Sequence, residues 1–173
     1  MKTLTKILQK EILPISLILL LAFSRLMPHP PNFTPIIAGA IFMPFMVQRS
    51  FGIVMPLVIM LVSDLIIGLH GLIFWTYGSL GLITFLSYQY IKKKFISVLK
   101  VASVSPIIFF LLTNFGVWLT STAYSPDLAG LINSYILALP FLANSLISTI
   151  LFSSCFYAIY YSLNLQSKLE SNL

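Results

Sequence analysis

Long apolar runs separated by short polar interruptions make up most of the chain. Within the runs the apolar residues follow one another without the strict alternation of a half-buried strand, which favours helices. The runs predict six helices in one bundle, at about residues 12–27, 36–47, 51–67, 72–91, 101–120 and 140–163. Residues 128–139 are apolar with polar interruptions, and we expect a short surface helix there, with the start of the last helix as the alternative.

Composition places this bundle in a membrane. Of the 173 residues, 58% are hydrophobic and only 8% are charged, against about 25% charged residues in an ordinary soluble domain. Such a chain has too few polar residues to cover a surface that faces water. We therefore predict an all-α integral membrane protein, with residues 1–173 forming a single membrane domain.

Basic residues orient the predicted helices. Nine of the ten Lys and Arg residues fall at alternate boundaries of the bundle, and Arg25 is left alone on the other side. The positive-inside rule then puts both termini in the cytoplasm, with the protein in the cytoplasmic membrane. The nine residues are Lys2, Lys6, Lys10, Arg49, Lys92, Lys93, Lys94, Lys100 and Lys168. Apart from residues 92–94 they form no basic stripe, so we do not expect nucleic-acid binding.

The first apolar run follows three lysines and so also resembles a secretory signal, with residues 22–24 as a faint cleavage site. A retained first helix is the better interpretation, because the chain after it is itself apolar.

A rigid proline-rich loop separates the first two predicted helices. Residues 28–35 contain four prolines, which cannot occupy a helix interior because each lacks a backbone donor and restricts the residue before it. Non-helical backbone beside a bilayer must be solvated or buried in protein. The loop is interpreted either as a wall of an outward-facing polar site or as the lead into a short second helix.

Polar and aromatic residues gather on the predicted outer side, where we expect a substrate-binding site. The candidates are Arg25, His29, Asn32, Thr34, Asp64, His70, Trp75, Asn114, Trp118 and Asn144, and Tyr77 and Tyr124 belong to the same group. The inner side has few comparable groups, which argues against a polar pore through the bundle.

Arg25 and Asp64 lie at matching depth and could form an ion pair, contact a ligand or reach the nearby interface. Asn114 and Trp118 stand four residues apart, on one helical face, and together could bind a flat polar ligand. A tryptophan in this position is also typical of the aromatic belt of membrane proteins. Asn144, like Asn114, needs a hydrogen-bond partner from another helix or from a substrate.

Several other chemistries are disfavoured. His29 and His70 have no third ligand at a diagnostic spacing, so we expect no metal site and no cofactor, with His29 as a hydrogen-bonding loop residue. We expect Cys155 to be a small buried hydrophobe. The spacing of Ser145, Thr149 and Ser153 predicts helix packing. Motifs of hydrolases, metalloproteases and phosphate-binding loops are missing, which argues against an enzyme.

Four motifs carry a resemblance to a known family: residues 31–36, 63–70, 114–118 and 139–144. They resemble those of an uncharacterised family of small six-helix bacterial membrane proteins, which in turn is similar to the substrate-binding (S) components of ECF-type vitamin transporters. The resemblance implies capture of a vitamin-like solute from outside, with an ECF-type transmembrane subunit and two ATPases as partners. Ala22 is followed by Leu26 rather than by a second alanine, so the small-residue face by which many S components dock their partner is missing.

Two functions therefore compete. The first is a substrate-binding membrane subunit, or a solitary importer, for a small vitamin-like or nucleobase-like solute. The second is a structural membrane scaffold of the cell-elongation type, which would have no ligand cavity.

Overall fold

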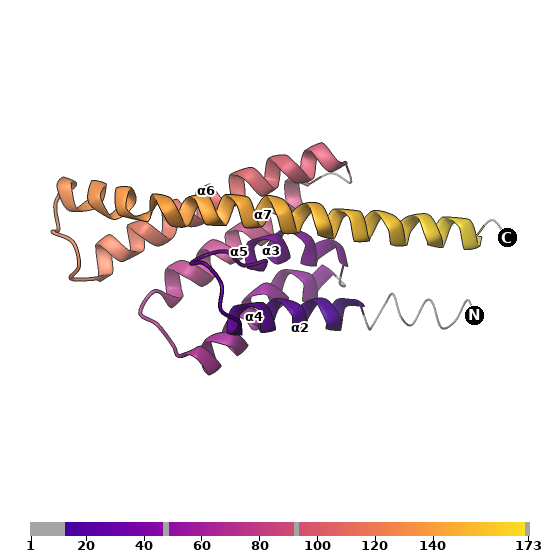
Figure 1. The fold of residues 1–173 in the computed structure, drawn as a ribbon, viewed down its shortest axis with the longest axis horizontal. Helices are drawn as coiled ribbons and strands as arrows, with labels where there is room; N and C mark the ends of the chain where they lie inside the picture. Colours follow the sequence, from indigo (N-terminus) through magenta and orange to yellow (C-terminus); the bar gives the residue numbers. More distant parts are fainter. Residues whose placement is uncertain (1–12, 47–48, 92–93, 172–173) are drawn as a thin grey trace.

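A computed structural model describes residues 13–46, 49–91 and 94–171. In these ranges the chain forms six α-helices and no strands, which confirms the all-helical prediction for this part of the protein (Figure 1). The helices are α2 (Leu13–Leu26), α3 (Ile36–Met46), α4 (Arg49–Ile67), α5 (Ile73–Tyr90), α6 (Phe95–Thr120) and α7 (Leu128–Ser171). Lys2, Lys6, Lys10, Lys92 and Lys93, used above for orientation, lie outside the described residues.

Two helices begin earlier than the sequence predicts. Helix α6 starts at Phe95 rather than at residue 101, and α7 runs without a break from Leu128 through Pro140. The expected separate helix over residues 128–139 is therefore wrong, and that segment is the first part of α7. Polar interruptions and a proline suggested boundaries here, but neither breaks the hydrogen-bonded helix.

Asp127 caps the start of α7. Its Oδ1 accepts hydrogen bonds from the backbone N–H of Gly130 at 2.7 Å and from the hydroxyl of Ser125 at 2.8 Å. These bonds, that of Gly130 first, stabilise the carboxylate and hold the pKa of Asp127 below its usual range. The helix thus begins where an acidic residue satisfies a free backbone donor.

Helix α3 lies at the centre of the bundle. It contacts each of the other five described helices, and residues 36–44 are all buried. Small residues permit this enclosure: a Cβ atom at Gly39 would come within 2.5 Å of Leu21 on α2, and Ala38 and Ala40 have no exposed surface. The small residues at positions 38–40 thus allow neighbouring helices to approach α3 closely.

The bundle has two distinct ends (Figure 1). The loops 27–35, 68–72 and 121–127 lie together at one end, here named the proline-loop end. The start of α2 and the end of α7 lie at the opposite end, together with the end of α5 and the start of α6. We name this second end the basic end, because Lys94 and Lys100 lie there. The grouping of the three loops agrees with the alternation of helices read from the sequence.

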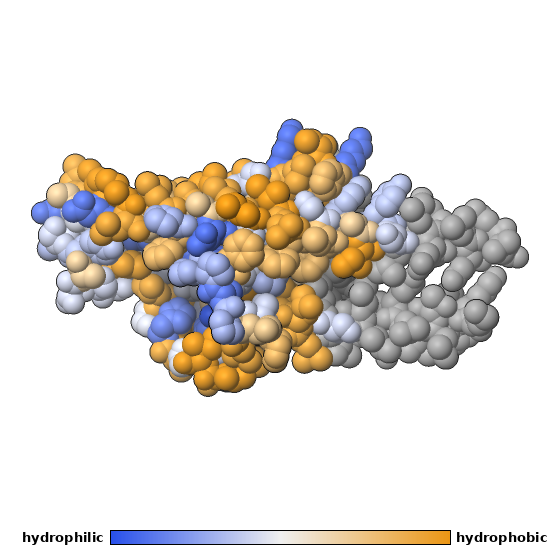
Figure 2. Space-filling model, in the orientation of Figure 1, coloured by the Kyte–Doolittle hydropathy of each residue, from blue (hydrophilic) through white to orange (hydrophobic). Residues whose placement is uncertain are grey.

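Apolar side chains cover much of the outside of the bundle (Figure 2). Phe74 is 77% exposed and Leu65 is 65% exposed, whereas many hydroxyl-bearing residues are buried. A water-soluble protein shows the opposite preference, with Ser and Thr mostly at the surface. The buried hydroxyl residues are Ser63, Thr76, Ser79, Thr84, Ser87, Ser105, Ser134, Ser145, Ser148, Thr149 and Ser153.

Among the described residues, two helical segments are long and apolar enough to cross a membrane, Phe95–Thr120 and Leu128–Ser162. Gly52–Ile67 is apolar but shorter. Length and composition therefore support two candidate spans among the described residues.

Cys155 is exposed, so the prediction of a buried cysteine is wrong. Helix α7 turns Ser153 and Phe156 inward, and Cys155 lies on its outer face. An apolar thiol on an apolar exterior has no need of burial.

Trp75 joins α5 to α6 by packing against Gly116. A Cβ atom at Gly116 would collide with the indole ring, and the ring also meets Phe115 edge to face with centroids 5.5 Å apart. The indole thus fills the space left by the glycine, and Trp75 has a packing role here.

Gly116→Ala is expected to destabilise the protein by about 1–3 kcal/mol, because the methyl group overpacks the Trp75 contact. Gly78→Ala is the matched control, since a Cβ at Gly78 on α5 meets nothing within 4 Å. Denaturant unfolding in detergent, followed by circular dichroism, measures both. Equal stability of the two variants would contradict the packing role of Gly116.

Candidate functional site

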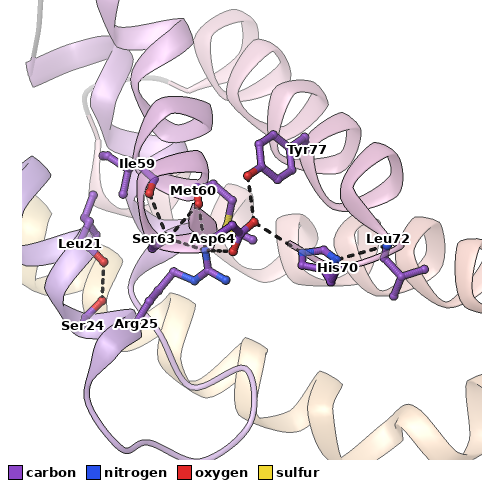
Figure 3. A network of polar contacts seen from close by, with 10 residues as sticks. All are labelled: Leu21, Ser24, Arg25, Ile59, Met60, Ser63, Asp64, His70, Leu72 and Tyr77. Carbon is purple, nitrogen blue, oxygen red and sulfur yellow. Dashed lines mark hydrogen bonds and ion pairs between the residues drawn. The ribbon is translucent and has the colours of Figure 1, made fainter. Parts of the chain in front are cut away.

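Asp64 is the centre of a polar network at the proline-loop end (Figure 3). It lies near the end of α4 with only 1% of its surface exposed, and its Oδ1 is 2.7 Å from Nη1 of Arg25 on α2. The Tyr77 hydroxyl on α5 donates to Asp64 Oδ2 at 2.8 Å. Of the three roles considered for Arg25 and Asp64, the structure thus shows the ion pair, and together with Tyr77 it links α2, α4 and α5.

Arg25 is bound to α4 at more than one point. Its Nη1 also donates to the Ser63 hydroxyl at 2.6 Å and lies 3.3 Å from the Met60 carbonyl oxygen. Because the Ser63 hydroxyl itself donates to the backbone of its own helix, its lone pairs are available to the guanidinium. The Nε and Nη2 groups of Arg25 have no partner among the residues that the structure describes.

His70 completes the network from the 68–72 loop. Its Nε2 lies 3.5 Å from Asp64 Oδ2, and its Nδ1 accepts a hydrogen bond from the backbone N–H of Leu72 at 3.2 Å. An imidazole that accepts at Nδ1 carries its ring proton at Nε2 when neutral, so that proton points toward the carboxylate (Figure 3). The loop turns at Gly68, whose φ of 119° suits glycine.

The proline loop contains a tight turn. The backbone N–H of Phe33 donates to the Pro30 carbonyl at 2.9 Å, and Asn32 has a φ of 61°. Proline at the second position followed by a residue with positive φ at the third is the pattern of a type II turn. The four prolines therefore give a defined conformation in which Asn32 takes the position that most residues avoid.

Helix α7 holds this turn in place. Asn144 Nδ2 donates to the Pro31 carbonyl at 2.9 Å, and the Ser148 hydroxyl lies 3.4 Å from the Asn32 carbonyl. The partner that the Asn144 amide was expected to need is thus the proline loop. His29 donates from Nδ1 to the Pro30 carbonyl at 2.8 Å, which confirms it as a hydrogen-bonding loop residue.

Two adjoining cavities lie at this end of the bundle, with volumes of about 290 Å³ and about 380 Å³. Pockets for small ligands are typically roughly 300–1,000 Å³. The first cavity lies under the proline loop and the second between α6 and α7. Their common walls are Arg25, Asn32, Met60, Phe109 and Ser145.

The polar groups of the cavities suit an uncharged ligand. Asp64 neutralises the charge of Arg25, which leaves Nε and Nη2 as donors. Asn114 donates through Nδ2 to the Phe110 carbonyl of its own helix at 2.8 Å, so its Oδ1 is open as an acceptor. Aromatic rings of Phe109, Phe110 and Phe141 border the same space, where a flat ligand can pack against them.

Six of the ten predicted site residues line these cavities and four do not. Arg25, His29, Asn32 and Thr34 line the first cavity, and Arg25, Asn32, His70 and Asn114 line the second. Asp64, Trp75, Trp118 and Asn144 are absent from both linings.

Each of these four has a supporting contact instead. Asp64 holds Arg25, Asn144 holds the proline loop and Trp75 packs on Gly116. Trp118 donates from Nε1 to the Ser125 carbonyl at 3.0 Å, which stabilises the 121–127 loop. They position the cavity walls rather than form them.

Sequence reasoning missed some of the lining residues. Phe109 reads as one apolar residue among many, and nothing in its spacing marks it. Ser145 was assigned to helix packing, and it is indeed buried in α7, but it also borders both cavities. Its position next to Asn144 was the available signal.

No set of three or more His, Cys, Asp or Glu residues that could hold a metal occurs within the described ranges. His29 and His70 line different cavities.

The fold and site define a helical-bundle protein with paired polar cavities beneath a proline loop. The chain belongs to the family of unknown function designated DUF6580, whose sequence profile matches residues 5–171. No curated protein and no solved structure matches the chain.

Removing one of the two charges of the Arg25–Asp64 ion pair is expected to destabilise the protein. Asp64→Leu and Arg25→Leu are each expected to lower the free energy of unfolding by about 3–5 kcal/mol, because each leaves a charge buried without its partner. The double variant should lose much less than the sum of the two, since neither charge remains.

Tyr77→Phe serves as the control, because it removes a hydrogen bond to Asp64 and leaves the pair intact. It is expected to cost about 1.5–3 kcal/mol. Denaturant unfolding of the four variants measures the coupling. Losses that simply add in the double variant would refute a direct interaction.

Proposed function

We propose that the protein is a multi-pass protein of the bacterial cytoplasmic membrane with both termini in the cytoplasm. The apolar exterior and the buried hydroxyl residues support this placement, since helices in lipid expose large apolar side chains and pack through small ones. The exposed Lys94 at the basic end gives the direction, with that end inside and the proline-loop end outside.

In this orientation the two cavities lie on the outer side of the membrane, and a solute would enter them from outside the cell. The proposed ligand is a small, flat, uncharged molecule of vitamin-like or nucleobase-like character, bound by a substrate-binding subunit or a solitary importer. The single observation that carries the proposal is a pair of adjoining cavities walled by a charge-compensated arginine, by Asn32 and Asn114, and by phenylalanine rings. A multiply anionic ligand is disfavoured because Asp64 already cancels the charge of Arg25.

The likeness to S components adds partners to the proposal. If it holds, an ECF-type transmembrane subunit and two ATPases would supply the energy for release inside. The sequence contains no phosphate-loop motif, in keeping with ATP hydrolysis by a partner protein.

Labelling of single cysteines should reveal the orientation. In a Cys155→Ala background, Thr122→Cys in the 121–127 loop should react with a membrane-impermeant maleimide added to intact spheroplasts. Lys94→Cys at the basic end should react only after the membrane is permeabilised. Both replaced residues are exposed, so access through the protein does not limit either reaction. The reverse pattern would refute the proposed orientation.

Small molecules that co-purify with the protein should identify the ligand by mass spectrometry, and calorimetry then measures its affinity. Asn114→Ala is expected to weaken binding about two- to ten-fold, the effect of one lost hydrogen bond. Asn32→Gly should do the same, because glycine keeps the positive φ of the turn while removing the amide. Asn133→Ala is the matched control, since this exposed asparagine of α7 lines neither cavity.

Unchanged affinity in both variants would overturn the site. A folded protein that carries no small molecule and tolerates Asn114→Leu and Asn144→Leu would favour the cell-elongation scaffold instead.

A further inference from the structure

A second binding feature lies toward the basic end and shares no lining residue with the two cavities. It is a groove of about 400 Å³ between the last half of α5 and the first half of α6. Ile83, Ser87 and Tyr90 contribute one wall, and Ser97, Lys100, Val101, Val104, Ser105 and Ile108 contribute much of the other.

The groove follows the helices lengthwise. The α6 residues that line it recur every three or four positions from Ser97 to Ile108, and so form one continuous face. At 1.5 Å per residue this face is about 16 Å long. The surface of the groove is mainly apolar, which suits an extended hydrocarbon chain rather than a compact polar ligand.

Lys100 gives the groove a charge preference. It lines the groove, it is exposed, and the described residues offer it no ion pair, since Asp64 is the acidic residue found in ion pairs there and it lies at the other end. Lys94 is exposed at the start of the same helix. An apolar groove beside an exposed cation is complementary to an amphiphile with a negative head.

Ser87 is a second indication, after Lys100, that the groove binds a ligand. It lines the groove with no exposed surface, and its hydroxyl has no hydrogen-bond partner among the residues that the structure describes. Ser87 lies one turn before the end of α5 at Tyr90, so it stands near the same end of the groove as Lys100. A buried hydroxyl usually finds a partner, and the ester carbonyl of a lipid would be one.

We propose that this groove binds one anionic phospholipid, with an acyl chain between α5 and α6 and the phosphate beside Lys100. The proposal rests on the membrane placement argued above and adds a site on the cytoplasmic leaflet. The head group of an anionic lipid gains from a lysine near the membrane surface. A second copy of the chain fits less well, because a symmetric contact would bring Lys100 and Lys94 of both copies together.

Native mass spectrometry of the full chain in detergent tests the site. The probes are phosphatidylglycerol and phosphatidylcholine with the same acyl chains, added in equal amounts. The wild type is expected to retain phosphatidylglycerol preferentially. Lys100→Ala should reduce that preference about five-fold, whereas Lys100→Arg should keep it.

Val104→Trp should displace both lipids by filling the groove. Two controls accompany these variants. Ile107→Trp adds the same bulk at an exposed position of α6 that does not line the groove, and Lys94→Ala removes a charge outside it. Both should retain phosphatidylglycerol better than their groove counterparts.

Equal retention of the two lipids by the wild type would overturn the proposal, as would an unchanged preference in Lys100→Ala. Retention unaffected by Val104→Trp would place the lipid elsewhere and also refute the groove. Solute affinity at the proline-loop end should be the same in Lys100→Ala and wild type, so failure of the lipid site and failure of the solute site give different results.

Discussion

The enclosure of α3 by the other five described helices is the constraint on which the arrangement depends. A helix surrounded on all sides must carry small or apolar residues, and the segment before it must set its direction. The proline loop does this: its type II turn ends just before α3, and the Pro35 carbonyl accepts the N–H of Gly39 at 2.8 Å in the first helical turn. The loop therefore has both roles considered for it, as a wall of the polar site and as the lead into α3. The same turn that leads into α3 also brings Asn32 and Thr34 to the cavity wall.

Much of the fold follows from the sequence because apolar runs and costly charges leave few choices. The sequence alone suggests an ion pair between Arg25 and Asp64, since two opposite charges at one depth in an apolar bundle stabilise each other. The continuity of α7 could not be predicted from the sequence. Pro140 and the polar residues before it look like a helix boundary, and only tertiary packing decides otherwise. The prediction that Cys155 is buried was also wrong. Helix α7 carries apolar residues on every side, so its sequence gives no sign of which face turns inward.

The candidate site was predictable in place but not in detail. Spacing puts Asn114 and Trp118 on one helical face, yet Asn114 borders the second cavity while Trp118, one turn nearer the helix end, reaches the Ser125 carbonyl. Spacing fixes rotation about the helix axis, and it does not fix where a cavity ends along that axis. Phe109 shows the complementary limit, because an apolar lining residue and an apolar core residue have the same sequence signal.

The way in which Arg25 is held has a mechanical consequence. Its contacts with the Met60 carbonyl, Ser63 and Asp64 all reach residues within five positions of a single helix, α4. Helices α2 and α4 are thus fastened at one point near the proline-loop end, and neither can tilt there without carrying the other. The same guanidinium borders both cavities, so the joined ends of α2 and α4 contribute to the wall of each. The ion pair therefore couples the position of α2 to that of α4 at the wall that the two cavities share.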